Sequence, residues 1–240
     1  MSELLKTIEA FNRKERFFLF AYATGNDSRG LVLSPVFRAS LGAALGLEVP
    51  PEARGFVDYH IDWLHAAVLL ESAPAGANSP NWQPGTAEPA GQPTVPWVST
   101  GNQEDIDLLV VFERDGVTWL LLVEAKAETE WTNKQVHSKA ERFRRIFGSA
   151  SIDPAAPVQP RFCLMSPHRP QGLTAVDGEA WPAWMVGPGV SDRRAEFAWA
   201  KLAVPTGRRK VTGCDANGTP SRARKYWTVT EVGAADAVVE

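Results

Sequence analysis

The stretch Glu124-Ala125-Lys126 places a carboxylate and an ammonium two residues apart, directly after the apolar run from Trp119 to Val123. Side chains two residues apart in a strand point to the same face of the sheet, so both charges should share one face. With 28 acidic residues in 240, an acid two positions before a lysine is expected about once by chance. The surroundings of the tripeptide must therefore decide whether it forms a site.

Those surroundings predict a β-hairpin. Residues 105–113 and 117–125 are rich in β-branched and other apolar residues, and Arg-Asp-Gly at 114–116 is a turn signal. In an antiparallel pair the beginning of the first strand faces the end of the second. Asp107 should therefore pair with residues 123–125, which predicts that Asp107, Glu124 and Lys126 converge at one edge of the sheet.

Two carboxylates and one ammonium in this arrangement suit a metal-assisted hydrolysis. Carboxylate oxygens, together with a backbone carbonyl such as that of Ala125, are ligands that Mg²⁺ prefers. A bound Mg²⁺ lowers the pKa of its water and neutralises a phosphoryl oxygen. Lys126 can position the attacking water and stabilise the developing charge. Phosphodiester hydrolysis requires these same functions.

The pattern of Asp107, Glu124-Ala125-Lys126 on a hairpin and Gln135 on the following helix resembles the PD-(D/E)xK nuclease superfamily, which has the restriction-endonuclease-like fold. The resemblance covers residues 102–166 and departs from the family in having Ile106, not Pro, before Asp107. It implies a metal-dependent nuclease that hydrolyses nucleic acid, with DNA as the favoured substrate and Mg²⁺ or Mn²⁺ as cofactor. By the family's pattern, the metal would be held by Asp107, Glu124 and the Ala125 carbonyl. Lys126 would serve the water, and Gln135 would support Lys126 or a phosphate.

The family's upstream acid has four candidates here, and the sequence does not choose among them: Glu15, Asp58, Asp62 and Glu71. A further hypothesis is a different kind of hydrolase. Asp58, Asp62 and His65 would share one face of a helix at residues 57–71 and could bind a metal there.

The remaining chain predicts an α/β fold: a central mixed β-sheet flanked by helices, with a restriction-endonuclease-like core and N-terminal helices, in one nuclease-like domain over residues 1–240. Six prolines between residues 72 and 99 predict an irregular segment there. Helices are expected at 2–23, 34–46, 57–71 and 132–147; further strands are expected at 158–165, parallel to 117–125, and at 181–186 and 226–232.

Basic residues gather in a predicted hairpin or loop at 206–227 and on the helix predicted at 132–147. In a chain of net charge −3, these local clusters favour contacts with a nucleic-acid backbone. The candidates for phosphate contact are Lys139, Arg142, Arg208, Arg209, Lys210, Arg222, Arg224 and Lys225.

Composition excludes several protein classes. No apolar run approaches the roughly 20 residues of a membrane span, and the N-terminal residues lack a signal-peptide pattern. Two cysteines, Cys163 and Cys214, do not make a disulfide framework, which favours a cytoplasmic location. The main alternative function is a non-catalytic nucleic-acid- or partner-binding module that retains the nuclease fold. A homodimer, or a partner protein in restriction, phage defence or repair, is left open.

Overall fold

The computed structural model describes residues 2–11, 19, 22–23, 30–71, 104–127, 131–170, 173, 181–186, 196–203, 208–222 and 225–232. The proline-rich segment predicted at 72–99 lies outside these residues, as do Glu15 and Arg224.

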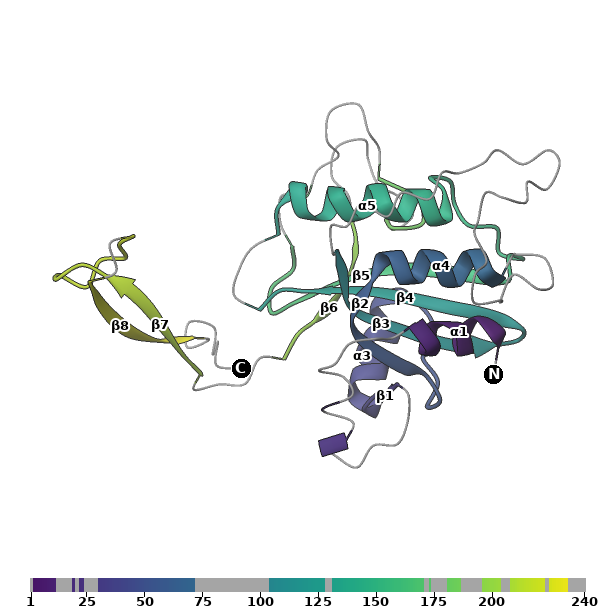
Figure 1. Cartoon of the computed structure of the whole chain (residues 1–240), viewed down its shortest axis with the longest axis horizontal. Coiled ribbons are helices and arrows are strands. Elements are labelled where there is room, and N and C mark those ends of the chain that lie inside the picture. The colour runs from purple at the N-terminus through teal and green to yellow at the C-terminus, as the bar shows by residue number, and fades with distance from the viewer. Residues whose placement is uncertain are drawn as a thin grey trace.

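A six-stranded mixed sheet forms the centre of the molecule (Figure 1). Neighbouring strands from β1 to β4 are antiparallel, and β4, β5 and β6 are parallel. The predicted hairpin and the parallel strand after the connecting helix are both confirmed, and so is the α/β class. In sheet order the strands are β1 (Leu31–Val32), β2 (Arg54–His60), β3 (Asp105–Arg114), β4 (Val117–Ala125), β5 (Val158–Ser166) and β6 (Ala198–Lys201).

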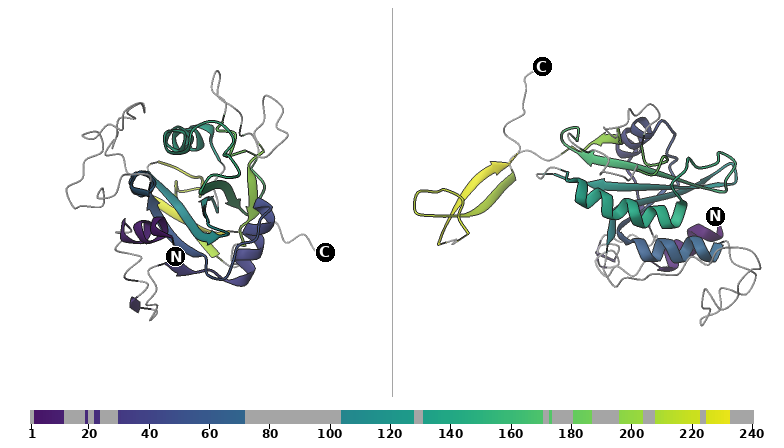
Figure 2. Two further views of the ribbon diagram at one scale, coloured as in Figure 1. Left: turned by 90° about the vertical axis from the view of Figure 1, so that its right-hand side faces the viewer. Right: turned by 90° about the horizontal axis from the view of Figure 1, so that it is seen from above.

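Helices cover both faces of this sheet (Figures 1 and 2). One face packs against α1 (Glu3–Phe11), α4 (Ile61–Glu71) and α5 (Asn133–Phe147), and the other against α3 (Pro35–Leu45). Strand β4 is apolar at successive positions because it contributes to both cores: Leu120 and Leu122 to the first, Leu121 and Val123 to the second.

The predicted boundaries of α3 are confirmed by its caps. The Ser34 hydroxyl accepts a hydrogen bond from the Phe37 N–H at 3.2 Å, and Pro35 occupies the first helical position. Gly46 ends the helix with φ 65°, a conformation that glycine adopts without a steric penalty.

The prediction of a helix over 57–71 is wrong in its first part. Residues 54–60 form β2, and the helix begins at Ile61. The aromatic residues Phe56 and Tyr59 are fully buried when this segment pairs with β3, so tertiary packing outweighs the helical periodicity. Asp58 therefore does not share a helix with Asp62 and His65. Residues 181–186, expected as a strand, form a turn with one isolated bridge between Val186 and Phe197.

Strands β2 and β3 are distorted where Asp58 lies opposite Asp107. The flanking pairs are Val57 with Leu108 and Tyr59 with Ile106, and Asp58 has φ 48°, in the left-handed region. Phe56 and Tyr59 are three residues apart yet contribute to the same core. Because a regular strand alternates its faces, this spacing marks a break in the alternation at Asp58.

Strand β6 covers only part of β5. Its pairing runs from Cys163 to Ser166 of β5, so residues 158–162 have no ladder partner on that side among the described residues. The Met165 carbonyl accepts the N–H of Lys126, the residue after β4, so backbone groups of odd-numbered β5 residues face β4 and those of even-numbered residues face the other way. Pro160 thus has its nitrogen on the side without a ladder partner among the described residues, and it is itself buried.

Two further strands, β7 (Arg208–Cys214) and β8 (Tyr226–Val232), form a separate antiparallel ribbon. It extends away from the six-stranded sheet in the views of Figures 1 and 2. The strand expected at 226–232 is confirmed, and the basic segment is a hairpin.

Candidate active site

The register of the β3–β4 hairpin brings the predicted residues to one end of the sheet. Leu108 pairs with Val123, which puts Asp107 opposite Glu124. A cavity of about 210 Å³ lies at this end. The structure brings all five residues predicted for catalysis and metal binding to its wall: Asp107, Glu124, Ala125, Lys126 and Gln135.

Glu124 is the most buried acid at this cavity, with 5% of its surface exposed. Its Oε2 atom accepts a hydrogen bond from the Lys139 ammonium, while Oε1 is buried and has no hydrogen-bond partner among the described residues. The pKa of Glu124 is raised to about 7 in total: burial raises it most, Lys139 lowers it, and Asp107 raises it. Oε1 is therefore the carboxylate oxygen of Glu124 that remains able to accept a ligand.

Asp107 is anchored to the strand that carries Glu124. Its Oδ2 atom accepts the Ala125 N–H at 2.7 Å, which ties the carboxylate to the end of β4. The N–H of Lys126 donates to the Met165 carbonyl at 2.8 Å, so β5 holds the residue after β4 in place. The Lys126 ammonium lies 5.8 Å from the centre of the Trp131 ring, within the range of a cation–π contact.

Lys139 and Arg142 lie within the protein, although the sequence favoured them as phosphate contacts. The Lys139 ammonium bridges Glu124 and the Asp105 carbonyl, the latter at 2.7 Å. The Arg142 side chain is 13% exposed and pairs with Asp62 at 3.1 Å and Glu104 at 3.8 Å. These contacts place both cations as counter-charges to acids around the cavity.

Glu104 and Trp131 line the same cavity, and sequence reasoning missed both. A signal for Glu104 exists, because it immediately precedes β3 and lies three residues before Asp107. Among the candidates for the upstream acid, Asp58 lies opposite Asp107 in register, Asp62 pairs with Arg142, and Glu71 is exposed at the end of α4. None of these three lines the cavity as Glu104 does.

The donor set suits a hard cation with few protein ligands. Two carboxylates, the Ala125 carbonyl and room for water match Mg²⁺, which retains several waters. The unpartnered Oε1 of Glu124 fits such a cation. Within the described ranges, no three His, Cys, Asp or Glu side chains are grouped to hold a metal, and this includes Asp58, Asp62 and His65. The helical metal trio thus lacks the shared face on which it depended.

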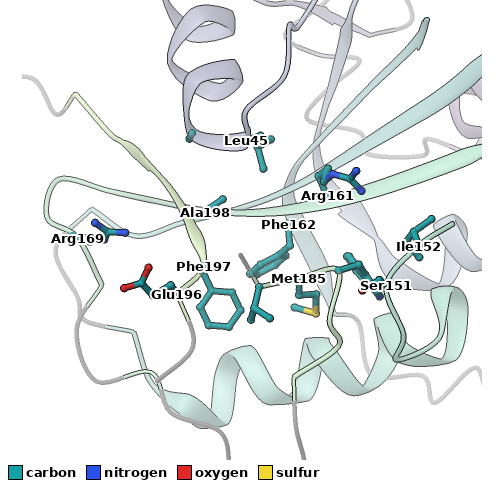
Figure 3. Close-up of a pocket in the computed structure, with 13 residues that line it drawn as sticks. Leu45, Ser151, Ile152, Arg161, Phe162, Arg169, Met185, Glu196, Phe197 and Ala198 are labelled. Atoms are coloured by element: carbon teal, nitrogen blue, oxygen red, sulfur yellow. The ribbon is translucent and has the colours of Figure 1, made fainter. Parts of the chain in front are cut away.

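A larger cavity of about 430 Å³ lies where β6 begins beside β5 (Figure 3). Its floor is apolar, with Phe162, Met185 and Phe197, and Figure 3 shows Arg169 and Glu196 at one side and Arg161 at another. The Arg161 guanidinium donates to the Pro160 carbonyl at 2.8 Å. Glu196 is the one acid among the described residues that line this cavity, so they contain no equivalent of the pair Asp107 and Glu124.

Basic residues of the ribbon lie on a different part of the molecule from the cavity. The structure describes the side chains of Lys210, Arg222 and Lys225, which are exposed. Arg208 and Arg209 occupy the first two positions of β7. The predicted catalytic and phosphate-binding residues therefore form two groups.

No helix in the described part of the chain has both the length and the apolar character needed to cross a bilayer. Comparison with protein-family models, with curated proteins and with solved structures gives no significant match.

Proposed function

We propose that this protein is a metal-dependent nuclease that hydrolyses phosphodiester bonds of nucleic acid, with DNA as the first substrate to test. One observation carries the proposal: Asp107, Glu124 and Lys126 line a single cavity in which a buried Glu124 oxygen has no hydrogen-bond partner within the described ranges. The resemblance of these residues to the PD-(D/E)xK pattern supports it. Two buried free thiols, Cys163 and Cys214, fit a reducing cytoplasm.

Each side chain has a separate task in this proposal. Asp107, Glu124 and the Ala125 carbonyl would hold Mg²⁺ or Mn²⁺, which when bound lowers the pKa of water and neutralises phosphoryl charge. Lys126 orients the attacking water and stabilises the charge that develops on the phosphoryl group. Gln135, at the first turn of α5, hydrogen-bonds Lys126 or a phosphate oxygen. Lys139 keeps the Glu124 carboxylate oriented and partly neutralised.

One observation favours the non-catalytic binding module instead. The Lys139 ammonium already contacts Glu124, so the acid has a cation without any metal. Lys139 contacts only Oε2, however, and Oε1 has no hydrogen-bond partner in the described part of the chain. The two functions differ in whether divalent metal is required.

The test is incubation of the full chain with supercoiled plasmid, linear DNA and RNA, in Mg²⁺, Mn²⁺ or EDTA. We expect nicking or cleavage with Mg²⁺ or Mn²⁺ and none with EDTA. Glu124→Gln, which keeps the side-chain volume and removes one anionic ligand, should weaken Mn²⁺ binding in calorimetry. If the parent cleaves none of these substrates under any of these conditions, the binding module is the better description.

A further inference from the structure

The β7–β8 ribbon exposes a tryptophan that no cross-strand side chain covers. Trp227 pairs with Gly213, and 70% of its surface is exposed. Val211 and Val229, the next pair on the same face, are also exposed. A folded ribbon gains nothing from an indole without a facing side chain, because sheet stabilisation comes from cross-strand side-chain pairs. The ring face is therefore available to an external partner.

The surroundings of this ring are strongly basic. Residues 208–232 contain six Lys or Arg and two acids, a local charge of +4 in a chain whose total is −3. Asp215, one of the two acids, shapes the turn: its Oδ1 accepts the N–H groups of Asn217 at 2.8 Å and Thr219 at 3.0 Å. The charge of the ribbon fits a polyanion, and it opposes pairing with the same ribbon of a second copy.

An open hollow of about 450 Å³ runs beside the tryptophan's partner strand. It is bounded by Val211 and Gly213 of β7 and by the loop at Pro220–Arg222, which is tied back where the Ser221 N–H donates to the Gly213 carbonyl at 3.1 Å. Lys210 and Arg222 contribute to its wall. Apolar surface and cations thus meet at one place on the ribbon.

We infer that the ribbon is a binding site for single-stranded nucleic acid, in which Trp227 stacks on an unpaired base and Arg222, at the edge of β7, contacts the adjoining phosphate. Stacking on aromatic side chains combined with basic grooves is how proteins hold single strands. A two-stranded ribbon also fits the major groove of a duplex, but a duplex keeps its base faces stacked and offers nothing to an exposed indole. This inference deepens the proposed function by naming the form of substrate that the nuclease takes, and it rests on that function for its use.

The experiment measures fluorescence anisotropy of labelled oligo(dT) of about 15 nucleotides, and of a duplex of the same length, in EDTA, where no cleavage occurs. Trp227→Ala should weaken binding of the single strand about 5- to 150-fold, the loss of one stacked base. Trp227→Phe, which keeps a ring, should lose less than about fivefold. Tyr226→Ala is the matched control, since Tyr226 is an exposed aromatic neighbour on the opposite face.

Two outcomes overturn the inference. One is equal binding of the single strand by the parent and Trp227→Ala; the other is a duplex that binds as tightly as the single strand and is weakened equally by Trp227→Ala. Gel filtration at the same concentrations completes the test: if Trp227→Ala converts a dimer to a monomer, the face belongs to a second copy and the inference is wrong. Because binding is measured in EDTA, these results are independent of whether the parent cleaves. If the parent binds the single strand but does not cleave it with Mg²⁺ or Mn²⁺, the proposed function is contradicted and the inference about the ribbon is not.

Discussion

The cavity at the end of β4 and the β7–β8 ribbon both contain several charged residues, but the charges are buried at the cavity and exposed on the ribbon. At the cavity, Glu124 and Lys139 are buried or nearly so, and they pair with each other. On the ribbon, Lys210, Arg222 and Lys225 are exposed. Burial strengthens electrostatic interactions and shifts pKa values, whereas exposed charges act at longer range and are screened by salt. The cavity is thus suited to chemistry, and the ribbon to holding a charged chain.

The largest effect is expected at Lys126 of the cavity. Lys126→Ala should reduce cleavage about 100- to 1000-fold, because a donor to the transition state is lost, while DNA binding stays nearly unchanged. Lys134→Ala is the control, since this exposed lysine of α5 removes the same charge outside the cavity. The measurement is the turnover rate on plasmid with Mg²⁺. A Lys126→Ala protein that cleaves at the parent rate would rule out the role of Lys126 in the transition state.

Lys139 should matter for stability, with a clear pH dependence. Its removal leaves the buried Glu124 charge without its counter-ion, a loss of about 3 kcal/mol in the free energy of unfolding when Glu124 is ionised. Glu124 already has a folded-state pKa raised above its ordinary value of 4.5 to about 7. The folded state therefore binds the proton more tightly than the unfolded state, and the parent should lose stability as pH rises from about 4.5 to about 7.

Lys139→Ala raises the pKa of Glu124 further, so its deficit against the parent should be small at about pH 5 and larger at about pH 8. Urea unfolding in EDTA at both pH values measures this. The double variant Lys139→Ala with Glu124→Gln carries no buried charge and should recover most of the loss at the higher pH. A deficit that is equal at both pH values, or one that the double variant retains, would contradict the pairing.

On the ribbon, the effect should appear in the salt dependence of binding. Replacing Arg208, Arg209 and Lys210 with Ala should weaken DNA binding and flatten its dependence on salt by about one unit of slope per lost phosphate contact. The matched control removes three exposed lysines elsewhere: Lys6, Lys134 and Lys201. Equal flattening by both triple variants would mean that only net charge matters.

The smallest effect is expected at Asp58, whose φ is 48°. Asn tolerates the left-handed region about as well as Asp, so Asp58→Asn should change the free energy of unfolding by less than about 0.5 kcal/mol. Asp58→Ala should cost about 1 kcal/mol, because an alanine is strained there. Urea unfolding of the two variants tests the distortion; equal stability would show that the strand relaxes.

Hairpin, caps and cavity could be predicted because the signals are local. The turn at 114–116 sets the register that places Asp107 opposite Glu124, and Ser34, Pro35 and Gly46 bound α3. The strand at 54–60 could not be predicted, because its helical spacing is overridden by pairing with β3, about 50 residues later in the chain.

The role of α5 could not be predicted either. Lys139 and Arg142 look like a solvated basic face in the sequence, and only tertiary packing against Glu124, Glu104 and Asp62 turns them inward. Glu104 was missed for a related reason: it lies just outside the strand pattern, and its position at the cavity depends on how the chain enters β3.

Pro160 has a consequence for self-association of the sheet. Exposed strand edges are templates for pairing with other chains and for aggregation, and proteins protect them with residues that cannot donate to a new ladder. Along residues 158–162 of β5, which have no ladder partner on the β6 side among the described residues, Pro160 turns a nitrogen without hydrogen toward that side. Pro160 is also buried, so packed side chains and a missing donor protect the same stretch of the edge. Replacing Pro160 with valine would restore the donor and leave the packing as the remaining protection against a strand from another molecule.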